Sequence, residues 1–179
     1  MKRSVDNAAE REKSMSKSEQ SLWDAFAGES QANRKYLAYA EKADNEGHPQ
    51  VGRMFRAAAA AETVHAHNHL RALGAIGTTE ENLKDAIAGE THEFKSMYPE
   101  MIEHAKAEEN EKALRSFELA SAVERTHAEL YEGLLATLGS EQEDFSYYVC
   151  PVCGHTVGKG APDICPVCGT AGSAFTKIN

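Results

Sequence analysis

The sequence lacks long apolar segments, is poor in basic residues and has no cysteine before position 150. No apolar run approaches the roughly 18 residues that a membrane-spanning helix requires, so we expect no part of the chain in a membrane. Only 19 residues are Lys or Arg against 28 Asp or Glu, and the net charge of −9 argues against nucleic-acid binding. The polar segment 1–17 lacks the apolar stretch of a secretory signal, and we expect it to form a flexible tail.

The four cysteines form two Cys-x-x-Cys pairs, each followed by a glycine. The first pair is Cys150 and Cys153, and the second is Cys165 and Cys168. A secreted disulfide scaffold would spread its cysteines through the fold, whereas clustered pairs indicate a metal site in a reducing compartment, so we expect a cytoplasmic location. Four thiolates at this spacing form a tetrahedral site for zinc or a single iron, and the spacing alone leaves that choice open.

Apolar residues recur with helical spacing between residues 18 and 139 and lose that period afterwards. The pattern predicts four helices, over residues 18–46, 49–73, 79–105 and 111–138. The chain then divides into a helical bundle over 18–139, a linker over 140–146, and a small domain of strands and loops over 147–179.

The helix boundaries carry recognisable capping residues. Ser18 is the expected N-cap of the first helix, and Asn110 that of the fourth. Thr78 and Glu81 have the spacing of a capping box for the third helix. Pro99 predicts a bend within that helix, because proline lacks the N–H that its turn requires.

The helical part contains an internal repeat. The segment Ala27-Gly28-Glu29-Ser30 recurs as Ala88-Gly89-Glu90-Thr91, and a Glu-x-x-His motif follows each of them. The motifs begin 33 residues after Glu29 and 34 residues after Glu90. The first two helices and the last two are therefore expected to be copies of one helical hairpin.

A glutamate falls near the middle of the apolar stripe of each helix. These four residues are Glu29, Glu62, Glu90 and Glu124. Unpaired carboxylates would not gather in a core, because like charges at low dielectric cannot all ionise. One Glu from each of two helices and Glu-x-x-His from each of the other two is the ligand set of di-iron carboxylate bundles. The three-residue step brings His65 and His127 onto the same helical face as Glu62 and Glu124. If the stripes were rotated, these glutamates would be solvated, but their presence in both copies argues against that alternative.

Glu93 lies one turn after Glu90 and is the expected fifth carboxylate of the site, with a plain surface glutamate as the alternative. Five carboxylates nearly balance the charge of two irons in both oxidation states, which suits repeated redox chemistry rather than storage. Tyr36 and Tyr98 follow the two Gly-Glu segments by two turns. A buried phenol needs a partner, and we expect a ligating carboxylate to supply it.

On these motifs and the paired cysteine segments, the chain resembles the rubrerythrins over about residues 18–179. The resemblance implies an all-α four-helix ferritin-like bundle followed by a small β/loop rubredoxin-like metal domain. It also implies a peroxidase that reduces hydrogen peroxide to water in oxidative-stress defence. Electrons would enter at an iron bound by the four cysteines, from a rubredoxin or an NAD(P)H-dependent reductase. The residues that match the family's di-iron ligands are Glu29, Glu62, His65, Glu90, Glu93, Glu124 and His127.

Two other functions remain open at this point. The same bundle serves in ferroxidase and iron-storage proteins, although Glu93 and the cysteine domain argue against that function. A second alternative is an electron carrier with a structural zinc ribbon, because zinc ribbons share the Cys-Pro-x-Cys-Gly segment. A redox-active di-iron site favours iron at the cysteines, since iron can supply electrons and zinc cannot.

The connection between the two hairpins is short, which bears on assembly. Only residues 74–78 separate the second and third expected helices. Five residues reach roughly 17 Å, whereas crossing helices of this length requires roughly 35 Å. Either residues 79–88 are not helical, or the first hairpin packs against the second hairpin of another chain. We favour the second alternative, a domain-swapped homodimer.

Overall fold

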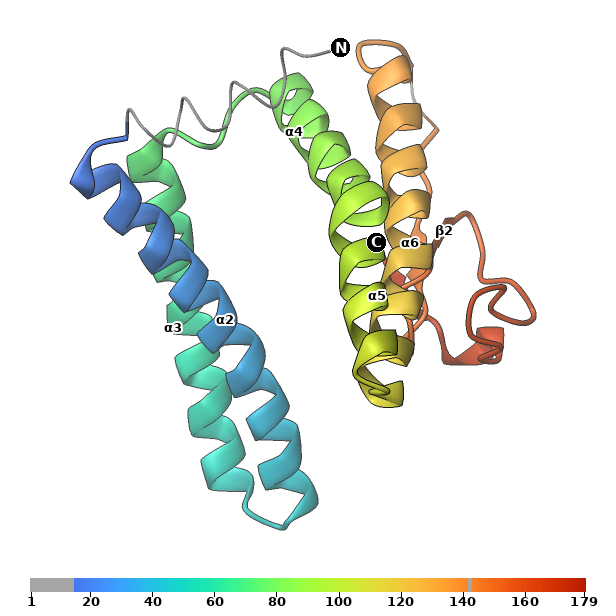
Figure 1. Cartoon of the computed structure of the whole chain (residues 1–179). Coiled ribbons are helices and arrows are strands. Elements are labelled where there is room, and N and C mark those ends of the chain that lie inside the picture. The colour runs from blue at the N-terminus through green and yellow to red at the C-terminus, as the bar shows by residue number, and fades with distance from the viewer. Residues whose placement is uncertain (1–14, 142) are drawn as a thin grey trace. The chain divides into compact units, whose positions relative to one another are not determined.

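A computed structural model describes residues 15–141 and 143–179, so most of the expected N-terminal tail lies outside the described residues (Figure 1). The chain forms two compact units, the first ending at Gly77 and the second running from Thr78 to Asn179. Within the described ranges, every helix is too short or too polar to cross a bilayer.

The first unit is a helical hairpin of α2 (Lys17–Asn45) and α3 (Pro49–Leu73). Helix α2 begins one residue earlier than expected, because Ser16 rather than Ser18 is its N-cap. The Ser16 hydroxyl accepts from the backbone N–H of Glu19, whose carboxylate accepts from the backbone N–H of Ser16, which completes a capping box. Helix α3 has the expected bounds and ends at Gly74, whose φ of 63° is the left-handed conformation favourable to glycine.

Small residues allow α2 and α3 to pack closely. Ala40 and Ala59 are each 1% exposed, and Gly52 lies so near α2 that a Cβ there would collide with the carboxylate of Asp44. The amide of Asn33 donates to the carbonyl of Ala59 at 2.7 Å. These contacts fix the rotation of α3 relative to α2, and hence the side of the hairpin on which their inner residues lie.

The second unit begins with one long helix of three parts. These are α4 (Thr79–His92), a π-helical turn (Glu93–Met97) and α5 (Tyr98–Ala107). The expected capping box of Thr78 and Glu81 is present. Pro99 stands in the first turn of α5, and the wide π turn precedes it. Since proline clashes with the carbonyl four residues before it in a regular helix, the π turn accommodates Pro99 where the sequence predicted a bend.

The π turn also explains why the two copies of the hairpin differ in length. Tyr36 follows Glu29 by seven residues, whereas Tyr98 follows Glu90 by eight. A π turn holds one residue more than an α turn, so it absorbs the extra residue and keeps the two tyrosines equivalent. Their rings pack on equivalent phenylalanines, Tyr36 on Phe55 with centroids 6.1 Å apart, and Tyr98 on Phe117 at 6.4 Å.

Helix α6 (Glu111–Thr137) completes the second helical hairpin, and the side chain of Asn110 caps it as expected. The chain then forms β1 (Tyr147–Val149), β2 (Thr156–Gly158), a 3-10 turn (Gly172–Ala174) and β3 (Thr176–Ile178). The strands make an antiparallel sheet in the order β2-β1-β3, with Tyr148 opposite both Val157 and Lys177. This confirms the expected fold class of helical hairpins followed by a small domain of strands and loops.

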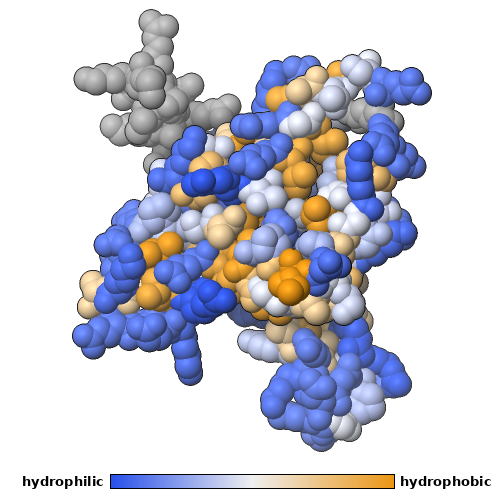
Figure 2. Space-filling model, turned by 90° about the vertical axis from the view of Figure 1, so that its right-hand side faces the viewer, coloured by the Kyte–Doolittle hydropathy of each residue, from blue (hydrophilic) through white to orange (hydrophobic). Residues whose placement is uncertain are grey.

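A layer of two helices cannot bury all of its apolar side chains. Figure 2 shows hydrophobic residues exposed among hydrophilic ones on the face that it displays. In the first unit, the exposed large apolar residues include Trp23, Leu37, Tyr39, Val51 and Met54. Helices with apolar faces are stable when another layer covers them, so the first hairpin has the surface of half a bundle.

Candidate metal centres

The first unit brings together Glu29 of α2 with Glu62 and His65 of α3. Nδ1 of His65 lies 2.8 Å from Oε2 of Glu62 and 3.8 Å from Oε1 of Glu29. One turn of helix separates Glu62 from His65, which places both on the same face of α3. The two glutamates are half-buried, and the His65 side chain is 53% exposed.

The second unit repeats this arrangement with Glu90 of α4 and with Glu124 and His127 of α6. Nδ1 of His127 lies 2.8 Å from Oε2 of Glu124 and 3.8 Å from Oε1 of Glu90. These are the same distances as in the first unit, as the internal repeat predicts. The His127 side chain is more buried, at 26% exposed.

Both groups of side chains fit a metal ion. In each, one ligand atom from every residue lies within 4.8 Å of the others. Oxygen and nitrogen ligands bind divalent transition metals such as zinc at about 2.1 Å, so two ligands of one ion lie roughly 3 to 4 Å apart. Two carboxylates and an imidazole nitrogen therefore offer half of a dinuclear site on each unit.

The second group is electrostatically strained without a cation. Burial raises the pKa of Glu90, and the charge of Glu124 raises it further. Burial and the charge of Glu90 likewise raise the pKa of Glu93. A bound cation would relieve the repulsion among these carboxylates, which is the electrostatic reason to expect metal here.

Glu93 and the two tyrosines lie near the candidate ligands without joining the groups. Glu93 is half-buried at the start of the π turn, outside the three-residue group of Glu90, Glu124 and His127. Burial and the charges of Glu124, Glu93 and Glu90 raise the pKa of Tyr98. Among the described residues, neither Tyr36 nor Tyr98 has a hydrogen bond to a carboxylate, so their expected role stays a prediction.

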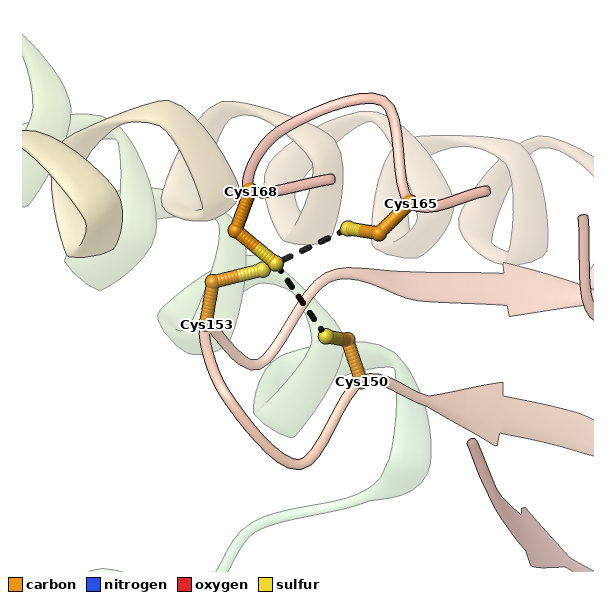
Figure 3. A group of neighbouring side chains, drawn as sticks. All are labelled: Cys150, Cys153, Cys165 and Cys168. Carbon is orange, nitrogen blue, oxygen red and sulfur yellow. Dashed lines mark hydrogen bonds between the residues drawn. The ribbon is translucent and has the colours of Figure 1, made fainter. Parts of the chain in front are cut away.

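The four cysteines converge from two loops, as Figure 3 shows. Sγ of Cys150 lies 3.5 Å from Sγ of Cys168, and Sγ of Cys153 lies 3.6 Å from Sγ of Cys165. Thiolates bound tetrahedrally at about 2.3 Å are separated by roughly 3.8 Å. The thiols therefore stand nearly where a tetrahedral metal ion requires them.

The two cysteine loops have matching backbones. Gly154 donates its N–H to the carbonyl of Cys150 at 2.9 Å, and Gly169 donates to the carbonyl of Cys165 at 3.0 Å. Both glycines have a φ near 80°, which a side chain would strain. This is the physical reason for the glycine that follows each Cys-x-x-Cys pair.

The protonation of the cysteine thiols is uneven. Burial raises the pKa of Cys153 to about 12. The hydroxyl and backbone N–H of Thr170 stabilise the Cys168 thiolate and lower its pKa to about 6. A metal ion would draw all four thiols into the thiolate form.

Two threonines near these centres were not identified from the sequence. Thr170 contacts Sγ of Cys168 at 3.1 Å, and Oγ1 of Thr156 lies 3.0 Å from Nε2 of His127. The position of Thr170 just after the second Cys-x-x-Cys-Gly segment was a usable signal. No local pattern indicates the Thr156 contact, because it joins residues 29 positions apart.

Comparison with known proteins identifies the family of the chain. Residues 20–135 match the rubrerythrin family model, and residues 148–176 match that of the rubrerythrin rubredoxin-like domain. The chain belongs to the rubrerythrin family. It is 37% identical over 171 residues to rubrerythrin-2 of Clostridium acetobutylicum, which covers 86% of this chain and 92% of the relative. It is 35% identical over 185 residues to the rubrerythrin of Porphyromonas gingivalis, with 92% of both chains covered.

Solved rubrerythrin-family structures resemble the chain as well. Nigerythrin in a partially reduced state has a TM-score of 0.56 and 30% identity, covering 92% of this chain and 88% of the other. A fully reduced, all-ferrous nigerythrin structure gives the same values. The family and the two kinds of side-chain cluster give the protein a di-iron carboxylate centre and a rubredoxin-like four-cysteine centre, and they support an oxidoreductase.

Metal content provides the first test. Protein purified from iron-replete cells should hold about three irons per chain, two at the carboxylates and one at the cysteines. Elemental analysis measures this content, and C150S should lower it by one iron while leaving the carboxylate iron in place. Persistent loading with one metal per chain would contradict the dinuclear assignment.

Proposed function

We propose that this rubrerythrin-family protein is a non-haem di-iron peroxidase that reduces hydrogen peroxide to water. The reaction consumes one peroxide, two electrons and two protons and yields two waters. Electrons enter through iron at the four cysteines, supplied by a rubredoxin or an NAD(P)H-dependent reductase. A reducing compartment such as the cytoplasm would keep the four thiols available for metal.

The observation that carries this proposal is the presence of two carboxylate-histidine groups of equal geometry and a four-cysteine site in one chain. A storage protein needs the first feature but has no use for the second. Iron at the cysteines is favoured over zinc because only iron can transfer electrons. The relatives point the same way, since the nigerythrin structures are described by their states of reduction.

The residues have separable roles in this proposal. Glu29, Glu62, His65, Glu90, Glu124 and His127 hold the iron pair, with Glu93 as the additional carboxylate. Iron held by these residues would supply the two electrons that the reduction of peroxide requires. The raised pKa of Tyr98 keeps its phenol protonated at neutral pH, so Tyr98 can donate a hydrogen bond near the carboxylates. Glu93 is also the carboxylate proposed to pass protons to the reacting oxygen atoms.

The direct test is NADH oxidation that requires peroxide, a supplied reductase and this protein together. The expected stoichiometry is one NADH per peroxide, because both are two-electron reagents. NADH oxidation with oxygen but without a response to peroxide would indicate an oxidase instead. Assembly into a large hollow shell that takes up ferrous iron would indicate storage.

A substitution at Glu93 tests its role as the additional carboxylate. In the internal repeat, the position equivalent to Glu93 is Ala32, so E93A makes the second copy resemble the first. The peroxidase rate should fall at least roughly tenfold, the scale of loss when a residue that tunes a metal site is removed. Both ferrous irons should still bind, as elemental analysis would show.

The matched control for this substitution is E100A. Glu100 belongs to the same long helix and is exposed, so its loss should leave the rate unchanged. If E93A and the wild type have equal kinetics, Glu93 is an ordinary surface glutamate with no role at the iron site.

We also propose that the active form is a domain-swapped homodimer. Each complete iron site would take Glu29, Glu62 and His65 from one chain and the remaining ligands from the other. The support is the connection between α3 and α4, which consists of Gly74 to Thr78 alone.

A further inference from the structure

The two histidines of the internal repeat differ in one respect. Nδ1 faces the carboxylates at the same distances in both. Nε2 of His127 lies 3.0 Å from the hydroxyl of Thr156 on β2, whereas Nε2 of His65 has no partner among the described residues. The cysteine domain therefore adds to His127 a contact for which the first hairpin has no counterpart.

The direction of this hydrogen bond follows from the other bond of Thr156. The Thr156 hydroxyl donates its single hydrogen to the carbonyl of Gly154 at 3.0 Å. A hydroxyl has one hydrogen and two lone pairs, so toward His127 it can only accept. Nε2 of His127 must therefore carry a proton. Without a metal ion, Nδ1 can also carry a proton and donate to Oε2 of Glu124 at 2.8 Å, whereas a metal ion would take the Nδ1 lone pair of the neutral imidazole.

A second contact holds the same two elements together. Gly154 lies over α6, where a Cβ on it would be 3.8 Å from Cγ1 of Val123. Val123 is 2% exposed and stands one turn before His127 on the same face of α6. The first cysteine loop and the strand after it thus contact α6 at two successive turns.

A pocket lies beside the contact between Thr156 and His127. A pocket of 370 Å³ is lined by Glu90 and His127 together with Tyr147, Thr156 and Ile178 of the sheet. The sheet therefore lies beside these candidate metal ligands, on the side on which Nε2 of His127 contacts Thr156. Thr156 lies between the cysteine loop and the carboxylate group.

We propose that Thr156 is the positioning residue of His127. Its hydroxyl accepts the Nε2 hydrogen and turns Nδ1 toward Glu90 and Glu124, and the same bond docks the cysteine domain on α6. Because the hydroxyl is also bonded to Gly154, the residue after Cys153, a short hydrogen-bonded route joins the cysteine site to His127. This inference rests on the ligand role of His127 in the proposed function.

The test is the exchange of the Nε2 proton, followed by NMR of the full-length protein labelled with nitrogen-15 at histidine. Spectra are taken before and after loading with zinc, a diamagnetic probe for both sites. In the wild type, the Nε2 proton of His127 should exchange at least roughly tenfold more slowly than that of His65, since a partly buried hydrogen bond protects it. T156V should abolish this protection, and T156S should restore it. T176V is the matched control, because Thr176 is exposed on β3 of the same sheet and its loss should change nothing.

Each outcome decides the proposal. Fast exchange in the wild type, protection that survives in T156V, or failure of T156S to restore it would overturn the role of Thr156. If T156V does not fold, the wild type and T156S still decide, since both must show protection. The Nδ1 resonance of His127 distinguishes a failure of the positioning role from a failure of the proposed function. If zinc leaves that resonance unchanged while Nε2 remains protected, the ligand assignment fails and the positioning bond stands.

Discussion

A refolded mixture of E62A and E124A chains is expected to regain about a quarter of the wild-type peroxidase activity, although each variant alone is inactive. In a swapped heterodimer, one iron site collects both lesions and the other collects none. Random pairing makes half of the dimers heterodimers, and half of their sites are intact. Activity measured after mixing, against each variant refolded alone, gives the result.

The physical reason lies in the length of the connection between α3 and α4. The five residues of the connection reach roughly 17 Å, and α3 alone is roughly 35 Å long. Thr79 is already helical and capped by Thr78, so α4 cannot unwind to lengthen the loop without losing its capping box. A chain whose second hairpin cannot reach its own first hairpin can still pack that first hairpin against the second hairpin of another chain.

A matched mixture controls for the refolding procedure. E29A and E62A both affect the first unit, so every site in any heterodimer of these two carries a lesion, and the mixture should stay inactive. If the mixture of E62A and E124A also stays inactive while heterodimers are detected by mass spectrometry, each chain builds its own site.

C165S is expected to abolish donor-linked peroxide turnover. Cys165 is 2% exposed and is one of the four thiols that converge, and a hydroxyl does not replace a thiolate in a tetrahedral iron site. Without iron at that site, electrons from a reductase have no entry point. When the bundle is reduced chemically instead, it should still consume peroxide in a single turnover.

The comparison with S173A separates loss of the metal from damage to the domain. Ser173 is exposed in the same domain and is not among the four cysteine ligands, so S173A should keep full turnover and the visible spectrum of ferric iron bound by thiolates. Steady-state activity that survives in C165S would mean that the cysteine domain is only structural.

Much of the fold was predictable because local patterns determine it. The bounds of α3 follow from Pro49 in its first turn and Gly74 at its C-cap. The capping box at Thr78 and the cap at Asn110 follow from side-chain hydrogen bonds that a sequence displays. The N-cap at Ser16 was missed, because Ser18 is an equally good capping residue and only Glu19 decides between them. The π turn was not predictable from Pro99 alone, since proline is compatible with a kink, a break or a wider turn.

The candidate sites were likewise predictable where local patterns determine them and not where they depend on tertiary contacts. The grouping of Glu124 with His127 follows from helical periodicity, and the convergence of the cysteines follows from the repeated loop. The contact of Thr156 with His127 arises from how a sheet packs on a helix, which depends on tertiary contacts such as Gly154 with Val123. The roles of Glu93 and the tyrosines depend on ligand positions once both hairpins and the metal are assembled, so they remain predictions.

The π turn at Glu93–Met97 also determines which kinds of change this helix can tolerate. Deleting one residue there, such as Ser96, would restore a regular α-helix. Tyr98 would then follow Glu90 by seven residues, as Tyr36 follows Glu29, so the two side chains would stay on one side of the helix. The π turn itself would be lost, and with it the position that it gives to Glu93. A one-residue deletion there should therefore leave the packing of Tyr98 on Phe117 in place and change the iron site through Glu93.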